Sequence, residues 1–111
     1  LETIAHARQV LLHERSASVR HLAQVAVKAH AAGLRPALAT RLAYHESRFR
    51  RDVVSSAGAR GPLQAIPRYW CQGPRCDLVA AGLRALRYYL RRARGDERLA
   101  LCWYTGRRGC V

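Results

Sequence analysis

The strongest constraint on the fold is an apolar stripe with helical spacing between residues 77 and 94. Its members recur every three or four positions, as on one face of an α-helix, and are Val79, Leu83, Leu86, Leu90 and Ala93. Alanine and leucine are abundant in the chain and β-branched residues are few, which also favours helices. We therefore expect an all-α fold with at most a small β-hairpin.

The length of 111 residues suits one compact domain with a single core and is too short for two. Apolar spacing together with glycine and proline positions predicts six helices, near residues 2–14, 19–32, 36–49, 62–68, 77–94 and 97–104. Asp77 and Asp96 stand just before the last two and are expected to be N-caps. The one extended irregular region is expected at residues 50–61.

Glu46 is the carboxylate whose position is most informative. Leu38, Leu42 and Phe49 share one face if residues 36–49 are helical, and Glu46 follows Leu42 by four residues on that inward stripe. Partial desolvation there would raise the pKa of the carboxyl group. A carboxyl that stays protonated near neutral pH suits general acid catalysis at a sugar leaving group. Taken alone, Glu46 is better explained as a helix-end glutamate in a structural salt bridge with an arginine, and the neighbouring motif reverses that preference.

A longer motif begins at Glu46. It reads Glu46-Ser47-Arg48-Phe49, then Ser55, Gly58, Ala59, Gly61 and Gln64. The pattern resembles the signature of the soluble lytic transglycosylase family, lysozyme-like domains that cleave the glycan strands of peptidoglycan, and every spacing from glutamate to glutamine agrees. The likeness covers about residues 19–109. We therefore expect a lysozyme-like domain over residues 18–111, preceded by a helical extension at residues 1–17.

The resemblance implies a mechanism with one carboxyl group and no cofactor. Glu46 would protonate the oxygen between N-acetylmuramic acid and N-acetylglucosamine and then accept the proton of the C6 hydroxyl, giving a 1,6-anhydro sugar. Ser55, Gly61 and Gln64 are implied as substrate-binding residues, through hydrogen bonds or close backbone approach. A turn-forming serine and a capping amide are the structural alternatives for Ser55 and Gln64.

Two departures from the family pattern affect the site. The third motif of the family usually reads tyrosine, asparagine, any residue, glycine, whereas this chain has Trp103-Tyr104-Thr105-Gly106. In relatives that tyrosine hydroxyl lies near the catalytic glutamate, and an indole cannot replace it as an acceptor. Either Tyr104 reaches the site or catalysis proceeds without the hydroxyl, and Trp103 is expected to offer a stacking surface for a sugar ring. Pro62, where leucine is common, removes a backbone donor.

Two other functions stay open. A hydrolytic muramidase would use the same acid and a water, and ordinary glycosidases need a second carboxylate about 5–9.5 Å away. The chain has seven acidic residues, and Asp52 is the one close in sequence to Glu46. The other alternative is a non-catalytic cationic module that binds envelope polymers or nucleic acid.

The charge predicts anionic partners. The net charge is +13 with a pI near 11.2, and Lys28 is the one lysine beside 19 arginines. Such a chain is attracted to polyanions. No recognised nucleic-acid-binding motif appears, so we expect peptidoglycan and anionic envelope polymers rather than a specific nucleic acid. The basic segment 84–94 is interpreted as a core helix with a solvated face, although a membrane-surface helix has the same pattern.

Four cysteines fall into two close groups, Cys71 with Cys76 and Cys102 with Cys110. An even count in a small chain predicts two disulfides and an oxidising compartment. Three pairings are possible, of which the two local ones are favoured; zinc is the competing interpretation, but the spacings are not those of zinc sites and no metal is expected. No signal peptide or transmembrane segment is visible. We expect a monomer in the periplasm, the cell envelope or outside the cell; a phage lysis domain or an accessory enzyme of a secretion or conjugation system fits equally.

Overall fold

The computed structural model describes residues 3–13, 16–50, 52–71, 73–106 and 108–110. These residues form six α-helices: α1 (Ile4–His13), α2 (Ala17–Ala31), α3 (Pro36–Ser47), α4 (Pro67–Trp70), α5 (Leu78–Arg92) and α6 (Glu97–Tyr104). Within this part of the chain, β structure is limited to two isolated bridges, which pair Arg60 with Val54 and with Ala65. The expected all-α fold is confirmed.

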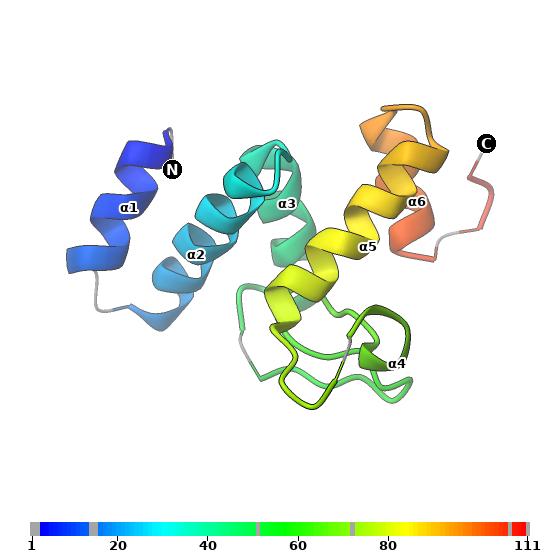
Figure 1. Ribbon diagram of the computed structural model, residues 1–111, viewed down its shortest axis with the longest axis horizontal. Helices are drawn as coiled ribbons and strands as arrows, with labels where there is room; N and C mark the ends of the chain where they lie inside the picture. The colour runs from blue at the N-terminus through cyan, green and yellow to red at the C-terminus, as the bar shows by residue number, and fades with distance from the viewer. Residues whose placement is uncertain (1–2, 14–15, 51, 72, 107, 111) are drawn as a thin grey trace.

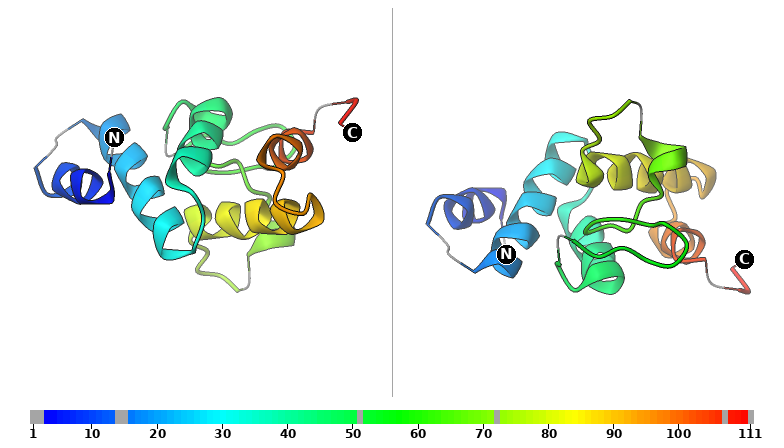
Figure 2. Two further views of the ribbon diagram at one scale, coloured as in Figure 1. Left: turned by 90° about the horizontal axis from the view of Figure 1, so that it is seen from above. Right: turned by 90° about the horizontal axis from the view of Figure 1, so that it is seen from below.

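The helices form an elongated molecule of 41 × 29 × 23 Å. Helix α1 packs beside α2 at one end, and α6 lies beside α5 at the other (Figure 1). The long connection between α3 and α5, which includes α4, lies below these two helices in the view of Figure 1. Views from above and below show α3 and α6 on the same side of α5 (Figure 2). This arrangement brings the end of α3 close to both the long connection and α6.

Local signals set most helix boundaries. The Asp77 carboxylate accepts hydrogen bonds from the amides of Val79 and Ala80, and that of Asp96 from the amide of Leu99. Both predicted N-caps are confirmed, and each satisfies donors that the first helical turn leaves unpaired. Gly33 has a φ of +77° between α2 and α3, the left-handed conformation in which glycine commonly ends a helix.

Two expectations about helices were wrong in their limits. Residues 62–68 do not form one helix: the chain turns at residues 61–64, and a short helix begins at Pro67. Gln64 has a φ of 51°, a left-handed conformation that an α-helix cannot contain. Helix α3 also ends before Phe49, because Arg48 and Phe49 both have positive φ. Phe49 nevertheless packs against the core from its place beyond the helix.

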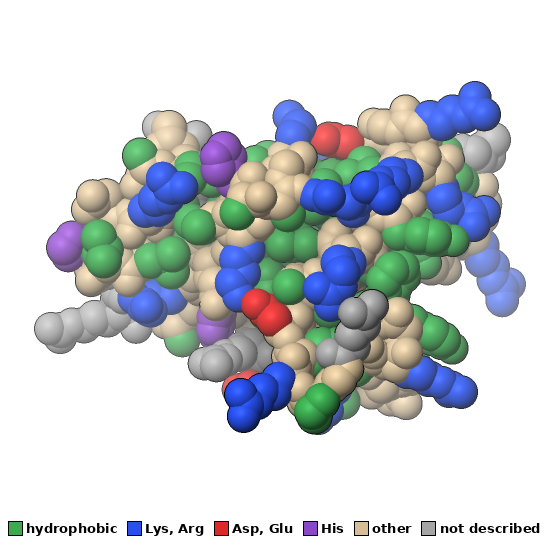
Figure 3. All heavy atoms as spheres, viewed as in Figure 1, with side chains coloured by type: hydrophobic (Ala, Val, Ile, Leu, Met, Phe, Trp, Pro, Cys, Tyr) green, Lys and Arg blue, Asp and Glu red, His purple; other side chains and the backbone are tan. Residues whose placement is uncertain are grey.

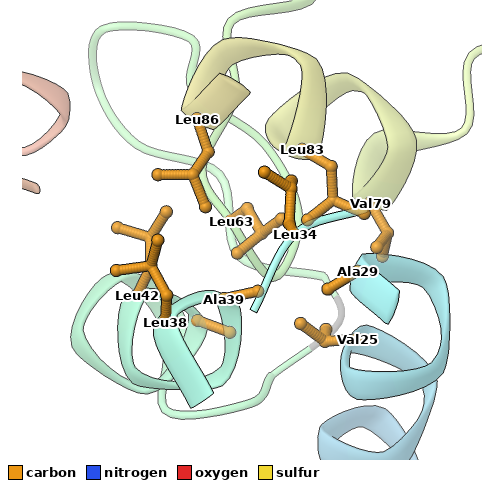
Figure 4. Packing of buried hydrophobic residues seen from close by; sticks show 11 residues of the cluster. Val25, Ala29, Leu34, Leu38, Ala39, Leu42, Leu63, Val79, Leu83 and Leu86 are labelled. Carbon is orange, nitrogen blue, oxygen red and sulfur yellow. The ribbon is translucent and has the colours of Figure 1, made fainter. Parts of the chain in front are cut away.

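The main core lies between α2, α3 and α5 (Figure 4). The predicted stripe on α5 faces it: Leu90 is partly buried and the other four members are buried. Leu42 of α3 and Leu86 of α5 are almost fully buried, and Leu63 inserts between them from the long connection. The packing of Leu63 thereby ties this connection to both helices.

Helix α1 packs on α2 through a separate small cluster. Its buried members are the alanines Ala7, Ala23 and Ala26, which let the two helices approach closely. The division into an extension at residues 1–17 and a domain at 18–111 stays a prediction. Among the described helices, none combines the length and the apolar character required to cross a membrane.

Both local disulfides are present, which confirms the favoured pairing. Cys71 and Cys76 bridge the segment between α4 and α5, with their Cα atoms 5.5 Å apart. Cys102 and Cys110 tie the C-terminal segment to α6, with a Cα separation of 5.8 Å. The four sulfur atoms are thus bonded in two pairs and are not free to act as zinc ligands. Two disulfides fit a protein of an oxidising compartment.

Candidate functional site

Glu46 lies in the last turn of α3 and is half-buried. It follows the buried Leu42 by one helical turn, as the spacing predicted. Burial raises the pKa of the Glu46 carboxyl, and the positive charge of the neighbouring His45 partly offsets that rise. The protonated form therefore persists to higher pH than in an exposed glutamate.

Ser47 fastens the long connection to the helical turn that carries Glu46. Its side chain is 1% exposed, and its hydroxyl donates to the carbonyl oxygens of Ala43 at 2.9 Å and Pro62 at 2.7 Å. Ser47 belongs to the motif that begins at Glu46, but the motif alone predicts no role for it. The available signal was a small hydroxyl residue directly after the candidate acid at a helix end.

Gln64 holds the backbone of the long connection together. Its amide nitrogen donates to the carbonyl oxygens of Val53 at 2.9 Å and Gly61 at 3.0 Å. Both hydrogens of the amide are therefore used inside the connection. The side-chain oxygen is the atom through which Gln64 could meet a ligand, and the expected role in substrate binding stays a prediction.

Ser55 and Gly61 also make contacts within the protein. The Ser55 hydroxyl oxygen accepts the amide of Ala59 at 3.0 Å and closes a tight turn, which is the structural alternative considered for it. Gly61 has a φ of +81°, and a Cβ atom there would lie 2.9 Å from the Cβ of Leu78 at the start of α5. Gly61 therefore allows helix α5, rather than a ligand, to approach the backbone closely. Contact of Ser55 or Gly61 with a sugar stays a prediction.

Tyr104 is the last residue of α6 and interacts electrostatically with the carboxylate of Glu46. Its hydroxyl donates to the carbonyl oxygen of Leu63 at 2.6 Å. Burial raises the pKa of Tyr104, and the negative charge of Glu46 raises it further, so the phenol and the carboxylate lie close enough to interact. The Tyr104 hydroxyl hydrogen is donated to the Leu63 carbonyl, and the expected role of Tyr104 in the site stays a prediction. Trp103, one residue earlier, is partly exposed.

A row of aromatic rings supports Tyr104 and was missed by the sequence analysis. Tyr89 packs edge-on against Tyr104 with 6.0 Å between ring centroids, and Tyr88 against Tyr89 with 5.2 Å. Trp70 of α4 extends the row to Tyr88 at 5.5 Å. The adjacent tyrosines on the predicted fifth helix were the signal, but their pairing with Tyr104 requires α5 and α6 to be side by side.

Two large grooves flank this centre. The first lies between α3 and α6, has a volume of about 1040 Å³ and is lined by His45 and Leu42, the neighbours of Glu46, although Glu46 itself is not in its lining. The second, about 1290 Å³, lies between α2 and the start of the long connection. Asp52 is exposed and lines this second groove, together with His21.

The described residues contain no group of three histidine, cysteine, aspartate or glutamate side chains arranged to hold a metal ion. The fold and the site together define a small, disulfide-bonded, strongly basic helical domain with a half-buried carboxyl beside a buried phenol. No protein-family model matches the chain, and no curated protein or solved structure matches it either. The likeness to lytic transglycosylases therefore depends on the motif residues alone.

Proposed function

We propose that this chain is a peptidoglycan lytic transglycosylase in which Glu46 acts as general acid and then as general base. The supporting observation is the half-buried Glu46 carboxyl, with a raised pKa, at the end of α3 beside Tyr104. A general acid needs a carboxyl group that remains protonated as the pH approaches neutrality. Ser47 and Tyr104 bind neighbouring carbonyls of the long connection, so the acid sits where three segments meet.

The proposed reaction has two proton transfers through Glu46. The carboxyl proton passes to the glycosidic oxygen between N-acetylmuramic acid and N-acetylglucosamine as the bond from that oxygen to C1 breaks. The N-acetyl group of the muramic residue stabilises the cationic centre. The Glu46 carboxylate then takes the proton of the C6 hydroxyl, whose oxygen bonds to C1 and forms the 1,6-anhydro ring. Tyr104 acts as a positioning residue beside Glu46, and Trp103 as a stacking surface for a sugar.

The shortage of acidic partners favours this single-acid mechanism over hydrolysis. A hydrolytic muramidase needs a second carboxylate within reach of the same sugar ring. Asp52, the acid nearest in sequence, is exposed and lines the groove beside α2. Glu97 and Asp77 are engaged in salt bridges with Arg35 and Lys28 elsewhere.

The arginine-rich surface supports a second activity, binding to anionic envelope polymers. Arg84, Arg87, Arg91 and Arg92 surround Tyr88 on α5. Basic side chains are spread over the face seen in Figure 3, where acidic ones are few. Phosphate-bearing polymers of the envelope would concentrate the enzyme near its substrate, and salt would weaken this attraction. The periplasm or cell envelope is the corresponding location.

The test is mass spectrometry of purified peptidoglycan digested by the wild type, by Glu46→Gln and by Asp52→Asn as the matched control. We expect anhydromuropeptides from the wild type and from Asp52→Asn, and none from Glu46→Gln. Reducing-end products, heavier by one water and lost in Asp52→Asn, would instead identify a hydrolase. Absence of soluble products from the wild type would refute the enzyme and leave a cationic binding module.

A further inference from the structure

The groove between α3 and α6 carries cationic groups that the proposed reaction does not use. Arg41 projects from α3, Arg98 from α6 and Arg108 from the C-terminal segment, and all three line the groove and are exposed. We call this the arginine groove. The Cys102–Cys110 disulfide fixes the segment that carries Arg108 to α6, so the third cation is held at the groove by a covalent bond.

The acidic residues of the arginine groove are already engaged. Glu97 forms a salt bridge with Arg35, with 2.9 Å between Oε2 and Nε. This pair joins the start of α6 to the start of α3. The Asp96 carboxylate caps α6 by accepting the amide of Leu99. Within the described part of the chain, no carboxylate lies in salt-bridge contact with Arg41, Arg98 or Arg108. Four arginines, including Arg35, face two carboxylates in this lining, so the groove keeps a net positive charge.

Apolar side chains form the inner wall of the same groove. Leu99 and Leu101 of α6 line it and are partly exposed, with the buried Leu38 and Leu42 of α3 behind them. A volume of about 1040 Å³ accommodates a ligand of a few residues. An apolar wall with a cationic rim suits a short peptide that carries both methyl groups and carboxylates. A phosphate polymer has no apolar groups to match the leucines and suits the open face of α5 better.

The arginine groove lies next to the turn of α3 that carries the candidate acid. His45 precedes Glu46 by one residue and Leu42 precedes it by one turn, and both line the groove. We infer that the arginine groove binds the carboxylate-bearing peptide stem attached to the glycan strand whose bond is cleaved at Glu46. The identity of the peptide rests on the proposed function, whereas its acidic character follows from the groove alone. Arginine suits this task because its planar guanidinium donates paired hydrogen bonds to a carboxylate.

The test measures binding of a fluorescently labelled acidic tetrapeptide stem by anisotropy, at fixed low salt. Arg41→Gln/Arg98→Gln removes two groove charges, and Arg91→Gln/Arg92→Gln removes two exposed charges from α5 as the matched control. We expect the groove variant to weaken binding about tenfold and the control by less than about twofold. A tetrapeptide with amidated carboxylates should bind weakly to all three proteins.

Equal losses of affinity in the two double variants, or equal binding of the acidic and amidated peptides, would overturn the inference, because net charge alone would then explain the binding.

Glucosaminyl-muramyl tetrapeptide should bind more tightly than the free stem if the groove is continuous with the Glu46 site. Equal binding of the two ligands would refute that continuity. The measurement requires no cleavage. A wild type that binds stems through the groove but releases no anhydromuropeptides would therefore disprove the proposed reaction without disproving the groove.

Discussion

Replacing Ser47 by alanine should loosen the connection from the helix that carries Glu46. The substitution removes one oxygen atom from a side chain that is 1% exposed, so it creates almost no cavity. Two carbonyl acceptors lose this donor, those of Ala43 and Pro62. The carbonyl of Ala43 lies four residues before Ser47 in the same helix and keeps its helical amide partner. The carbonyl of Pro62, in a buried residue, loses its tie to α3.

The expected cost follows from that single loss. Leaving a buried acceptor without its partner costs about 1–3 kcal/mol. Alanine has a higher helix propensity than serine by roughly 0.5 kcal/mol, which offsets part of the cost. We therefore expect Ser47→Ala to lower the free energy of unfolding by about 1–2 kcal/mol. For a domain of this size that corresponds to a fall in Tm of roughly 4–8 °C.

Urea denaturation followed by circular dichroism, with the disulfides intact, measures this change. The matched control is Ser56→Ala, an exposed serine of the same connection, which should change the free energy of unfolding by less than about 0.5 kcal/mol. An unchanged slope with a lower midpoint would place the loss in the native state. If Ser47→Ala were as stable as Ser56→Ala, the Ser47 hydroxyl would not hold the connection to α3 and the reasoning would be wrong.

Three further predictions concern the same centre. Gly82→Ala should lower the free energy of unfolding, measured in urea, by about 1–3 kcal/mol, because the new Cβ would lie 2.4 Å from the Cβ of Leu63. A gain in stability, as expected for alanine in an open helix, would contradict this close packing. Tyr104→Phe should lower the free energy of unfolding by about 1–2 kcal/mol, because it removes the hydrogen bond to the Leu63 carbonyl, and it should reduce cleavage of peptidoglycan. Unchanged stability together with unchanged cleavage would refute the role of Tyr104. Because the native pKa of Glu46 is raised, the native state binds its proton more tightly, so the contribution of Glu46 to stability falls as pH rises above about 4.5 until the raised pKa is passed. The stability of Glu46→Gln relative to wild type should therefore rise across that window, and a pH-independent difference would disprove the shift.

The elements that the sequence predicted well are those governed by neighbouring residues. The stripe on α5 and the Asp77 cap are contained within one helix, and both were found as expected. The inward position of Glu46 was predicted because it depends only on the four-residue step from Leu42. The local disulfides belong to the same category, since their cysteines are separated by 5 and 8 residues.

The predictions that failed depend on contacts between distant residues. A helix at residues 62–68 was expected from local preference. The left-handed φ of Gln64 instead accompanies a hydrogen bond from its side-chain amide to the Val53 carbonyl oxygen and the packing of Leu63 against α5. The arginine groove could not be predicted, because it forms only when α6 lies beside α3 and a disulfide brings Arg108 to the same place. No spacing rule within one element contains that information.

The segment from Pro62 to Leu63 explains how the candidate site is held together. The carbonyl of Pro62 accepts from Ser47 of α3, and that of Leu63 accepts from Tyr104 of α6. The side chain of Leu63 fits against Gly82 of α5, where any larger residue would collide with it. Two residues without charge or catalytic chemistry thus join three helices around Glu46. The departure at Pro62 fits this role, because the segment contributes carbonyl acceptors here and a proline retains its carbonyl while losing only the N–H.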